Sequence, residues 1–300
     1  MDSKVADCVD CGAPGIGIAW SSKEFPLAEC AACGLTYYAD WPKELADGAS
    51  FHEGNVSYYE RMEANPGDVV LQDLNLRRGA EVLAKLERLA PSKTLLDVGC
   101  GRGEGVFVAD CCGWHAQGID LAPGAIRIAR AHGLNCSDLD FFSPELDEER
   151  FGLIVMSEFL EHVPKPNRFL SRAHELLIPR GVVYLTTPNF GSLGRRVHGD
   201  SWNALSSGHV AFFNRQTISS LAQKAGFQVA RIETGVISVS AIKSVLTRKR
   251  ASKAEQVGDI QTLRTFAYGS WWGRCAKRTI EPAVAVSGLG ETLKVTLIRL

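Results

Sequence analysis

Short apolar runs and longer segments of helical spacing alternate along most of the chain. The runs are three to seven residues long and mostly rich in Val, Ile and Leu, which is typical of strands buried in a parallel sheet. Seven strands are predicted in this way, at residues 94–98, 114–119, 134–136, 152–156, 182–187, 227–233 and 293–298. Helices between the runs complete the pattern of an α/β fold.

Apolar residues recur at helical spacing before the first strand and after several later ones. They predict helices at residues 69–89, 106–112, 123–132, 167–176 and 215–225. Residues 189–214 are instead rich in Gly, Ser and Asn, which predicts a long loop. Long loops in compact domains are often functional lids.

The first strand runs directly into a glycine-rich turn. Gly99, Gly101, Gly103 and Gly105 alternate with Cys100, Arg102 and Glu104, and a helix follows. A strand, glycine turn and helix in this order aim backbone N–H groups at a ligand. The spacing departs from the dinucleotide-binding fingerprint G-x-G-x-x-G. No Lys-Ser/Thr pair follows the glycines, which excludes a phosphate-loop NTPase. A turn that binds no ligand is the alternative.

Two motifs carry a resemblance to a known family. Asp97 and the G-x-G-x-G turn resemble motif I of class I S-adenosylmethionine (SAM) methyltransferases. The run S-E-F-L-E-H-V at residues 157–163 resembles the ubiquinone-biosynthesis branch and the related type 23 methyltransferases. The resemblance implies a Rossmann-like seven-stranded sheet, with the last strand antiparallel, and a transferase that uses SAM.

The resemblance also assigns residues to the SAM site. They are Asp97, Gly99, Cys100, Gly101, Asp120, Leu121, Asp138, Ser157, Glu158, His162 and Arg78. Asp120 follows the second strand at a spacing that suits a ribose acceptor. Asp138 would bind the adenine amine and Arg78 the methionine carboxylate, with a loop aspartate and a solvated arginine as the alternatives.

Three residues are candidates for catalysis: His209, Glu158 and His162. Ligands lie beyond the carboxyl ends of parallel strands, so residues 157–162 should border the transferred methyl group. Glu158, Glu161 and His162 form a workable set for a divalent cation, although a hydrogen-bonded cluster is the alternative. His209 is a candidate general base because a neutral imidazole accepts a proton at physiological pH; it could instead pin the loop to the sheet.

Four cysteines near the N-terminus have the spacing of a zinc ribbon. Cys8 and Cys11 form one C-x-x-C pair, Cys30 and Cys33 form the second, and a glycine follows each pair. Four thiolates fill a tetrahedral Zn²⁺ site, so the metal should be structural. A redox pair or unliganded thiols are the alternatives.

Composition restricts the partners and the location. The chain has 300 residues and a net charge of −1, which argues against a dedicated nucleic-acid partner. It has neither an apolar run of membrane-spanning length nor a signal-peptide core near residue 1, so we expect a cytoplasmic protein. Oligomeric state is not predicted.

Four segments are predicted along the chain. Residues 1–45 form the zinc ribbon, 46–92 a linker and helical lid, 93–235 the SAM-binding core, and 236–300 a helical insertion with the last strand. The last segment has eleven Lys and Arg against four Asp and Glu. Its basic character suits a lid over an anionic acceptor or contact with a membrane surface; a solvated face is the alternative.

These observations predict methyl transfer from SAM to a small-molecule acceptor. A hydroxyl of a sugar or secondary metabolite is the expected group. An RNA methyltransferase and a scaffold without catalysis are the alternatives. No N-P-P-Y tetrad follows the fourth strand, and residues 1–45 hold only three basic side chains, which weighs against RNA.

Overall fold

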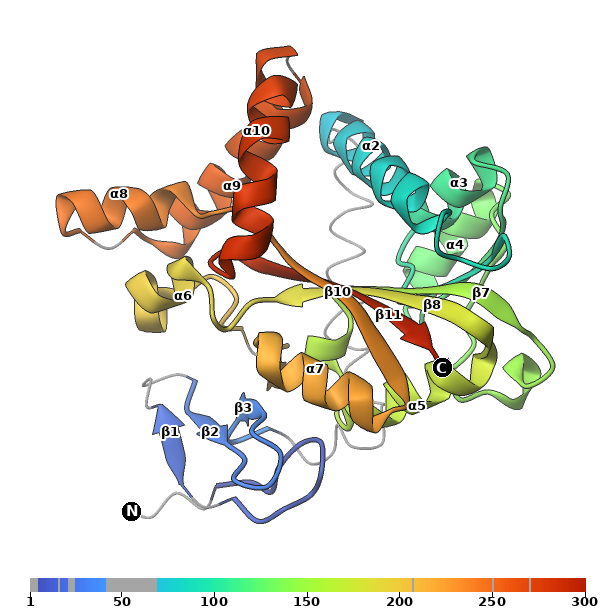
Figure 1. Cartoon of the computed structure of the whole chain (residues 1–300), viewed down its shortest axis with the longest axis horizontal. Helices are drawn as coiled ribbons and strands as arrows, with labels where there is room; N and C mark the ends of the chain where they lie inside the picture. The colour runs from blue at the N-terminus through green and yellow to red at the C-terminus, as the bar shows by residue number, and fades with distance from the viewer. Residues whose placement is uncertain are drawn as a thin grey trace.

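A seven-stranded sheet runs through the molecule in the order β10-β11-β8-β7-β4-β5-β6 (Figure 1). The computed structural model describes residues 5–15, 17–20, 25–41, 69–206, 208–249, 251–269 and 271–300. The strands of this sheet are β4 (Thr94–Val98), β5 (His115–Ile119), β6 (Cys136–Ser137), β7 (Phe151–Ser157), β8 (Leu177–Pro188), β10 (Phe227–Gly235) and β11 (Thr292–Arg299). The predicted α/β fold with seven strands is confirmed.

Strand direction changes at one edge of this sheet. Strands β8, β7, β4, β5 and β6 are parallel, whereas β11 is antiparallel to both β8 and β10, as the resemblance implied. Strand β8 begins at Leu177, five residues before the predicted strand. The added residues 177–181 contain an irregularity: the register against β7 shifts from a pair between Phe151 and Leu177 to a pair between Leu153 and Val182.

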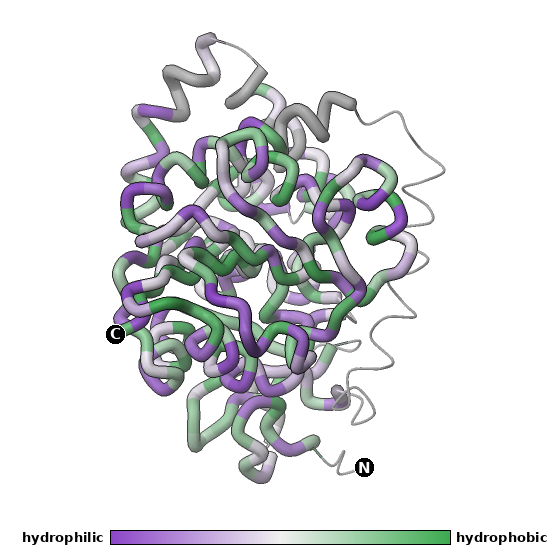
Figure 2. Tube along the Cα trace, turned by 90° about the vertical axis from the view of Figure 1, so that its right-hand side faces the viewer, coloured by the Kyte–Doolittle hydropathy of each residue, from purple (hydrophilic) through white to green (hydrophobic). Residues whose placement is uncertain are grey.

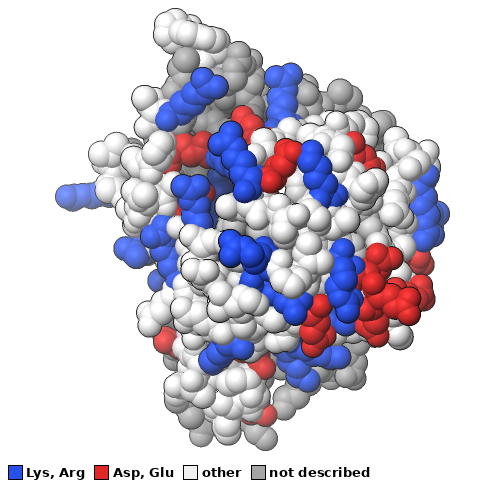
Figure 3. All heavy atoms as spheres, turned by 45° about the vertical axis from the view of Figure 1, so that its right-hand side comes forward, with Lys and Arg blue, Asp and Glu red and all other residues white. Residues whose placement is uncertain are grey.

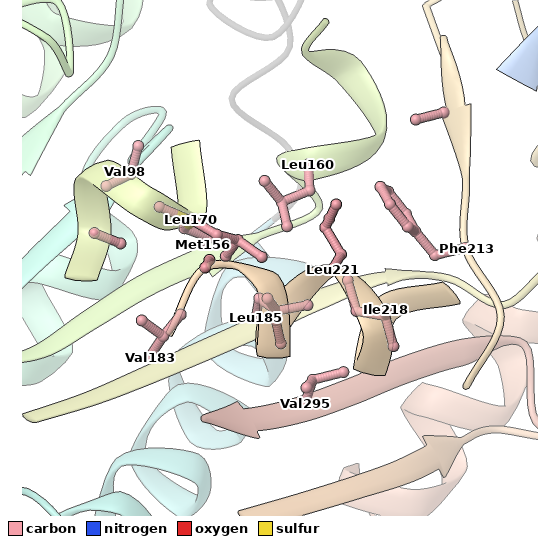
Figure 4. Close-up of a cluster of buried hydrophobic side chains, with 14 of the residues drawn as sticks. Val98, Met156, Leu160, Leu170, Val183, Leu185, Phe213, Ile218, Leu221 and Val295 are labelled. Atoms are coloured by element: carbon pink, nitrogen blue, oxygen red, sulfur yellow. The ribbon is translucent and has the colours of Figure 1, made fainter. Parts of the chain in front are cut away.

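Helices cover both faces of the sheet (Figure 1). One face carries α2 (Val69–Leu86), α3 (Glu104–Cys111) and α4 (Pro123–Ala131); the other carries α5 (Pro166–Leu176) and α7 (Arg215–Lys224). Side chains of a strand alternate between faces, so the neighbours Leu95 and Leu96 enter two different cores. Figure 4 shows the core beneath α5 and α7, and Figure 2 shows apolar stretches crossing the middle of the molecule.

The N-terminal segment forms a second, smaller sheet. Strands β1 (Ile18–Trp20), β2 (Leu27–Glu29) and β3 (Thr36–Tyr38) are joined by β9 (Ala211–Phe212), in the order β1-β2-β3-β9. This sheet lies on the same side of the main sheet as α7 (Figure 1). Buried residues of the N-terminal segment, such as Val9 and Tyr37, belong to the same apolar core as the main sheet.

The segment predicted as a long loop is largely ordered and buried. It contains α6 (Leu193–His198), η4 (Gly199–Ser201) and β9, and Trp202 and Phe213 are almost fully buried. The prediction of a long loop is therefore wrong for much of this segment, because it forms short helices and a strand and its aromatic side chains pack into the protein. Two further short helices precede it, η2 (Pro144–Leu146) and η3 (Leu160–His162).

Three helices form the insertion between β10 and β11. They are α8 (Val239–Thr247), α9 (Lys253–Gly269) and α10 (Trp271–Ser287). The insertion leaves and re-enters the sheet at one point, where the N–H of Glu291 donates to the carbonyl of Val236 at 2.8 Å. In the part of the chain described, no helix is both long and apolar enough for a membrane crossing. Residues 42–68, which include most of the predicted linker, lie outside the described residues.

Candidate active site

The turn after β4 exposes backbone without side chains at the carboxyl end of the strand. Gly99 and Gly101 have φ angles of 73° and 55°, a region that favours glycine. A Cβ at Gly99 would lie 2.8 Å from the ring of Phe159, and one at Gly105 would overlap the carboxylate of Asp97. Glycine is therefore required at both positions by close packing.

A pocket of about 430 Å³ opens between this turn, helix α2 and the carboxyl ends of β7 and β8. This volume lies in the usual range for small-molecule sites. Seven of the residues that the resemblance assigns to SAM line it: Arg78, Asp97, Gly99, Cys100, Gly101, Ser157 and Glu158. The structure therefore brings together residues that are up to 80 positions apart in the sequence.

Asp120 lies beside the pocket, at the end of β5, and braces the glycine turn. Its Oδ2 accepts a hydrogen bond from the N–H of Gly101 at 2.9 Å, and its Oδ1 accepts one from Ala122 at 2.9 Å. Each carboxylate oxygen has a second lone pair, so this side chain can still accept from a ligand hydroxyl. Leu121 follows it and is half-buried.

Asp138 lies farther out, beyond the end of β6. Its side chain is 61% exposed and forms a 3.0 Å ion pair with Arg130. It does not line the pocket described above. Its assignment to the adenine amine therefore stays a prediction.

Asp97 is the buried carboxyl of the pocket wall. Burial, and then the nearby Asp120 and Glu104 carboxylates, raise the pKa of Asp97 to about 7. The same wall contains Arg102, which forms a 2.9 Å ion pair with Glu104. The pocket thus combines several carboxyl groups with two arginines, Arg102 and Arg78, and suits a ligand that carries both signs of charge.

Glu158 connects this pocket to a second polar group. Its backbone has a φ of 50°, which is uncommon for a residue other than glycine. Its N–H donates to the carbonyl of Thr186 at 2.9 Å, and its Oε1 accepts from the Thr186 hydroxyl at 2.9 Å. Backbone strain of this kind is often found at functional sites.

Two histidines pack together beyond Glu158. The rings of His162 and His209 lie 4.7 Å apart in an edge-on arrangement. The Nδ1 of His162 donates to the carbonyl of Gly208 at 2.8 Å, and the Nδ1 of His209 donates to the carbonyl of Ala204 at 2.7 Å. These bonds assign the neutral tautomer that carries its lone pair on Nε2 to both rings.

Burial keeps both imidazoles uncharged. Burial, and then the neighbouring His162, lower the pKa of His209 to about 4, although the bond to Ala204 opposes them. The pKa of His162 is also lowered by burial, against the opposing effects of Gly208 and Glu158. Neutral imidazoles can accept a proton or bind a metal ion.

Glu161 lies close to both histidines and is the third polar side chain of this cluster. It is 1% exposed, and neither carboxylate oxygen has a hydrogen bond of good geometry among the described residues, although Thr187 and Glu158 lie close by. Burial, and then the Glu158 carboxylate, raise its pKa well above the usual range. Ligand atoms of Glu161, His162 and His209 lie within 4.8 Å of one another. The set that could hold a divalent cation thus includes His209, while Glu158 bonds to Thr186.

The four N-terminal cysteines converge as their spacing predicts. Their sulfur atoms lie within 4.8 Å of one another, with 3.6 Å between Cys8 and Cys33 and 3.5 Å between Cys11 and Cys30. Zn–S bonds of about 2.3 Å in a tetrahedron place sulfurs roughly 3.8 Å apart, so this cluster fits the metal. For Cys30, burial opposes ionisation, but backbone N–H groups outweigh it and lower the pKa of the thiol to about 7.

Some wall residues were not predicted from the sequence. Tyr184 of β8 and the apolar residues Val82, Leu83 and Leu86 of α2 line the pocket. The spacing of Leu83 and Leu86 on one helical face is a usable signal. Tyr184 is two positions before Thr186, and side chains two apart on a strand share a face, but only the sheet order shows which face meets the pocket.

Comparison with known proteins identifies the family of the core. The profile of a family described as a methyltransferase domain matches residues 74–232. The ubiquinone biosynthesis O-methyltransferase of Xanthomonas campestris pv. campestris is 28% identical over 49% of this chain and 66% of its own length. The protein of the same name from Hydrogenovibrio crunogenus is 35% identical over 33% of this chain and 44% of its own. The chain thus spans less than two thirds of either relative.

Solved structures support the fold. A SAM-dependent methyltransferase from Thermotoga maritima, described as a possible histamine N-methyltransferase, has a TM-score of 0.54 and 17% identity. The alignment covers 84% of this chain and 99% of that one. At this identity the similarity concerns the fold alone, which is that of class I methyltransferases. Since the matching profile spans more than half of the sequence, the chain belongs to the methyltransferase-domain family.

Proposed function

We propose that this protein transfers a methyl group from SAM to a hydroxyl group of a small molecule. One observation carries the proposal: Glu158 lines the glycine-lined pocket, and its carboxylate lies near enough to His162 to act on the pKa of that imidazole. A donor in the pocket and an acceptor near the histidines would therefore meet at the end of β7. Bound SAM supplies a methyl group already activated on a sulfonium centre.

The pocket residues fit SAM by charge and by shape. The glycine turn offers backbone without side chains, and Asp97 and Glu158 offer carboxyl groups for a ligand that carries ammonium and sulfonium charges. Arg78 offers a positive charge for the methionine carboxylate. Asp120 would accept from the ribose hydroxyls while it continues to brace Gly101.

The histidine pair would handle the acceptor hydroxyl. His209 presents a neutral Nε2, since its Nδ1 is committed to Ala204. A pKa of about 4 makes this imidazole a weak base toward a hydroxyl proton. A divalent cation held by Glu161, His162 and His209 is the alternative to His209 as the base. It would acidify the hydroxyl, and the buried carboxyl group of Glu161 fits that role.

We infer two further roles outside the pocket. The four-cysteine cluster would hold a structural zinc ion, because its four sulfurs leave no open coordination position. The insertion would present its exposed side chains, including Leu246, Trp271 and Trp272, to an anionic membrane surface or an anionic amphipathic acceptor.

Calorimetry and an acceptor screen test the proposal. Purified protein should bind SAM, and methyl-labelled SAM should yield labelled product, read by mass spectrometry, from a panel of phenols, catechols and sugars. Binding to SAM without any labelled product, with RNA included in the panel, would favour a scaffold. Labelled RNA without a labelled small molecule would favour an RNA methyltransferase. Absence of SAM binding would overturn the proposal at its first step.

A further inference from the structure

The turn between the first two cysteines bonds to the start of α5, shortly after His162. Between Cys8 and Cys11 stand Val9 and Asp10, and both bond to the start of α5. We propose that these two residues are positioning residues: the metal-loaded knuckle of residues 8–11 fixes the active-site segment 160–167, and the ribbon sheet fixes His209. This inference rests on the proposed function only for the role of the two histidines at the acceptor.

Asp10 caps helix α5 from a distant part of the chain. Its Oδ1 accepts a hydrogen bond from the N–H of Asn167 at 2.9 Å. Pro166, the first residue of α5, has no N–H, and Lys165 provides no side-chain cap among the described residues. A carboxylate at this position satisfies a backbone donor and interacts favourably with the helix dipole. The start of α5 is thus completed by a residue 157 positions away.

Val9 anchors the residue just before α5. Its carbonyl accepts a hydrogen bond from the N–H of Lys165 at 2.8 Å, and its side chain is 1% exposed. Lys165 has a φ of 55°, a conformation that a non-glycine residue keeps only when its surroundings hold it. Only two residues separate it from His162, so this strained turn sets how the histidine loop enters the helix.

A second set of backbone hydrogen bonds connects the ribbon to Val210, the residue after His209. Strand β3 pairs with β9, and the N–H of Tyr38 donates to the carbonyl of Val210 at 3.0 Å. The N–H of Val210 donates to the carbonyl of Glu161 at 2.8 Å. One residue next to His209 is therefore bonded to the ribbon on one side and to η3 on the other. Figure 4 shows Leu160 and Phe213, from the two segments joined in this way, in the same apolar core.

The glycine turn belongs to a different part of the molecule. Its hydrogen-bonded supports are the end of β5, through Asp120, and helix α3, and the ring of Phe159 packs against Gly99; the hydrogen bonds of the ribbon go instead to α5 and β9. The backbone of a four-cysteine knuckle is held by its metal. Loss of the metal, or of Asp10, should therefore loosen the acceptor side and leave the pocket around Gly101 unchanged.

Hydrogen-exchange mass spectrometry on the full chain tests this coupling. Asp10→Ala should speed amide exchange about tenfold in the peptide that covers residues 163–169, as expected for a lost helix cap. Asp10→Asn keeps an acceptor oxygen and should restore the wild-type rate. Glu29→Ala, an exposed ribbon carboxylate on β2, is the matched control and should change nothing.

Removal of the metal by a chelator should produce the same pattern, with faster exchange at 160–169 and 208–213 and no change at 99–105. Ring signals of His162 and His209 in histidine-labelled protein should shift with Asp10→Ala and with metal removal, and return with Asp10→Asn or reloaded zinc. Should Asp10→Ala fail to fold, the chelation and reloading series decides alone.

Two results would overturn the inference. One is unchanged exchange at 160–169 in both Asp10→Ala and metal-free protein. The other is equal acceleration at residues 99–105, which would indicate general loosening. SAM calorimetry on the wild-type protein separates the two proposals, because a lack of binding would remove the proposed function and leave the exchange result standing.

Discussion

The surroundings of Asp97 and His209 strongly change the chemistry of both side chains. Both lie on elements that converge at the carboxyl edge of the sheet, and burial acts on both. Burial disfavours the charged form of each, so it raises the pKa of the acid and lowers that of the base. The consequences differ, since one affects the stability of the fold and the other the proposed turnover.

Asp97 should make stability depend on pH. Its pKa in the folded protein is raised to about 7 from 3.8, so the folded state binds the extra proton. The stabilisation is then fully present below about pH 4 and is lost as pH rises through about 7. As pH rises through this window, we expect the free energy of unfolding of the wild type to fall by roughly 2–4 kcal/mol more than that of Asp97→Asn.

Urea unfolding of wild type and Asp97→Asn between pH 4 and pH 8 measures this difference, because titrations common to both proteins cancel. A difference in unfolding free energy that stays constant across the window would show that Asp97 is ionised throughout.

His209→Ala should slow methyl transfer without weakening SAM binding. General acid–base groups typically contribute about 100- to 10,000-fold in rate, so we expect a fall in kcat of at least about 100-fold. Exposed His132 is the control, and His132→Ala should retain wild-type turnover. Wild-type kcat for His209→Ala at saturating acceptor would remove this histidine from catalysis.

At the scale of elements, the turn between β4 and α3 and the cysteine ribbon do most to position the site. The turn depends on glycines because the carboxylate of Asp97 lies where a Cβ of Gly105 would be. The ribbon depends on a metal because its three strands are three residues each and cannot form a sufficient core alone.

Gly105→Ala should destabilise the turn and weaken SAM binding. The added methyl group meets a buried carboxylate, and such overpacking costs about 1–3 kcal/mol. Gly258→Ala is the matched control, since its Cβ would meet nothing within 4 Å and α9 should become slightly more stable. Thermal melts and SAM calorimetry on both variants check this; equal melting temperatures and affinities would contradict it.

The ribbon should contain one zinc ion per chain. Metal analysis of purified protein measures the ratio, and Cys11→Ser should lower it well below one while leaving SAM affinity near the wild-type value. Cys112→Ser, at an exposed cysteine outside the cluster, is the control and should keep the metal. A wild-type zinc content far below one per chain would reject the assignment.

At the scale of the whole molecule, charge and exposed apolar surface are unevenly distributed. On the face in Figure 3, Asp and Glu gather toward one edge, while Lys and Arg are spread over the remainder. The insertion adds exposed apolar side chains to basic ones: Trp272 is 72% exposed and Leu246 is 78% exposed, with Arg248 and Lys249 nearby. This combination is typical of surfaces that bind anionic interfaces.

The insertion should therefore bind anionic vesicles. In a sedimentation assay, the protein should be retained in the pellet of phosphatidylglycerol vesicles. Much less of it should be retained in the pellet of phosphatidylcholine vesicles. The double variant Trp271→Ala and Trp272→Ala should lower retention several-fold, whereas Phe107→Ala, at an exposed aromatic on α3, should not. Equal retention on both vesicle types would leave the substrate-lid interpretation in place.

The sequence by itself determined the local secondary structure and motifs, because these depend on residues that are close along the chain. The strand at 94–98, its glycine turn, the helix after it and the two cysteine pairs all follow from spacing and backbone preferences within short windows. The position of Asp97 and Glu158 at strand ends also placed them near one pocket, since parallel strands end at a common edge.

Only the tertiary structure decided how distant segments meet. His162 and His209 are 47 positions apart, and their contact depends on β9 pairing with β3 and not on any local pattern. The contact of Asp10 with α5 spans 157 positions and has no periodic signature. Burial of the segment at 189–213 was missed for the same reason: local composition favours a loop, whereas its few aromatic residues gain free energy by packing into a core that only the folded chain provides.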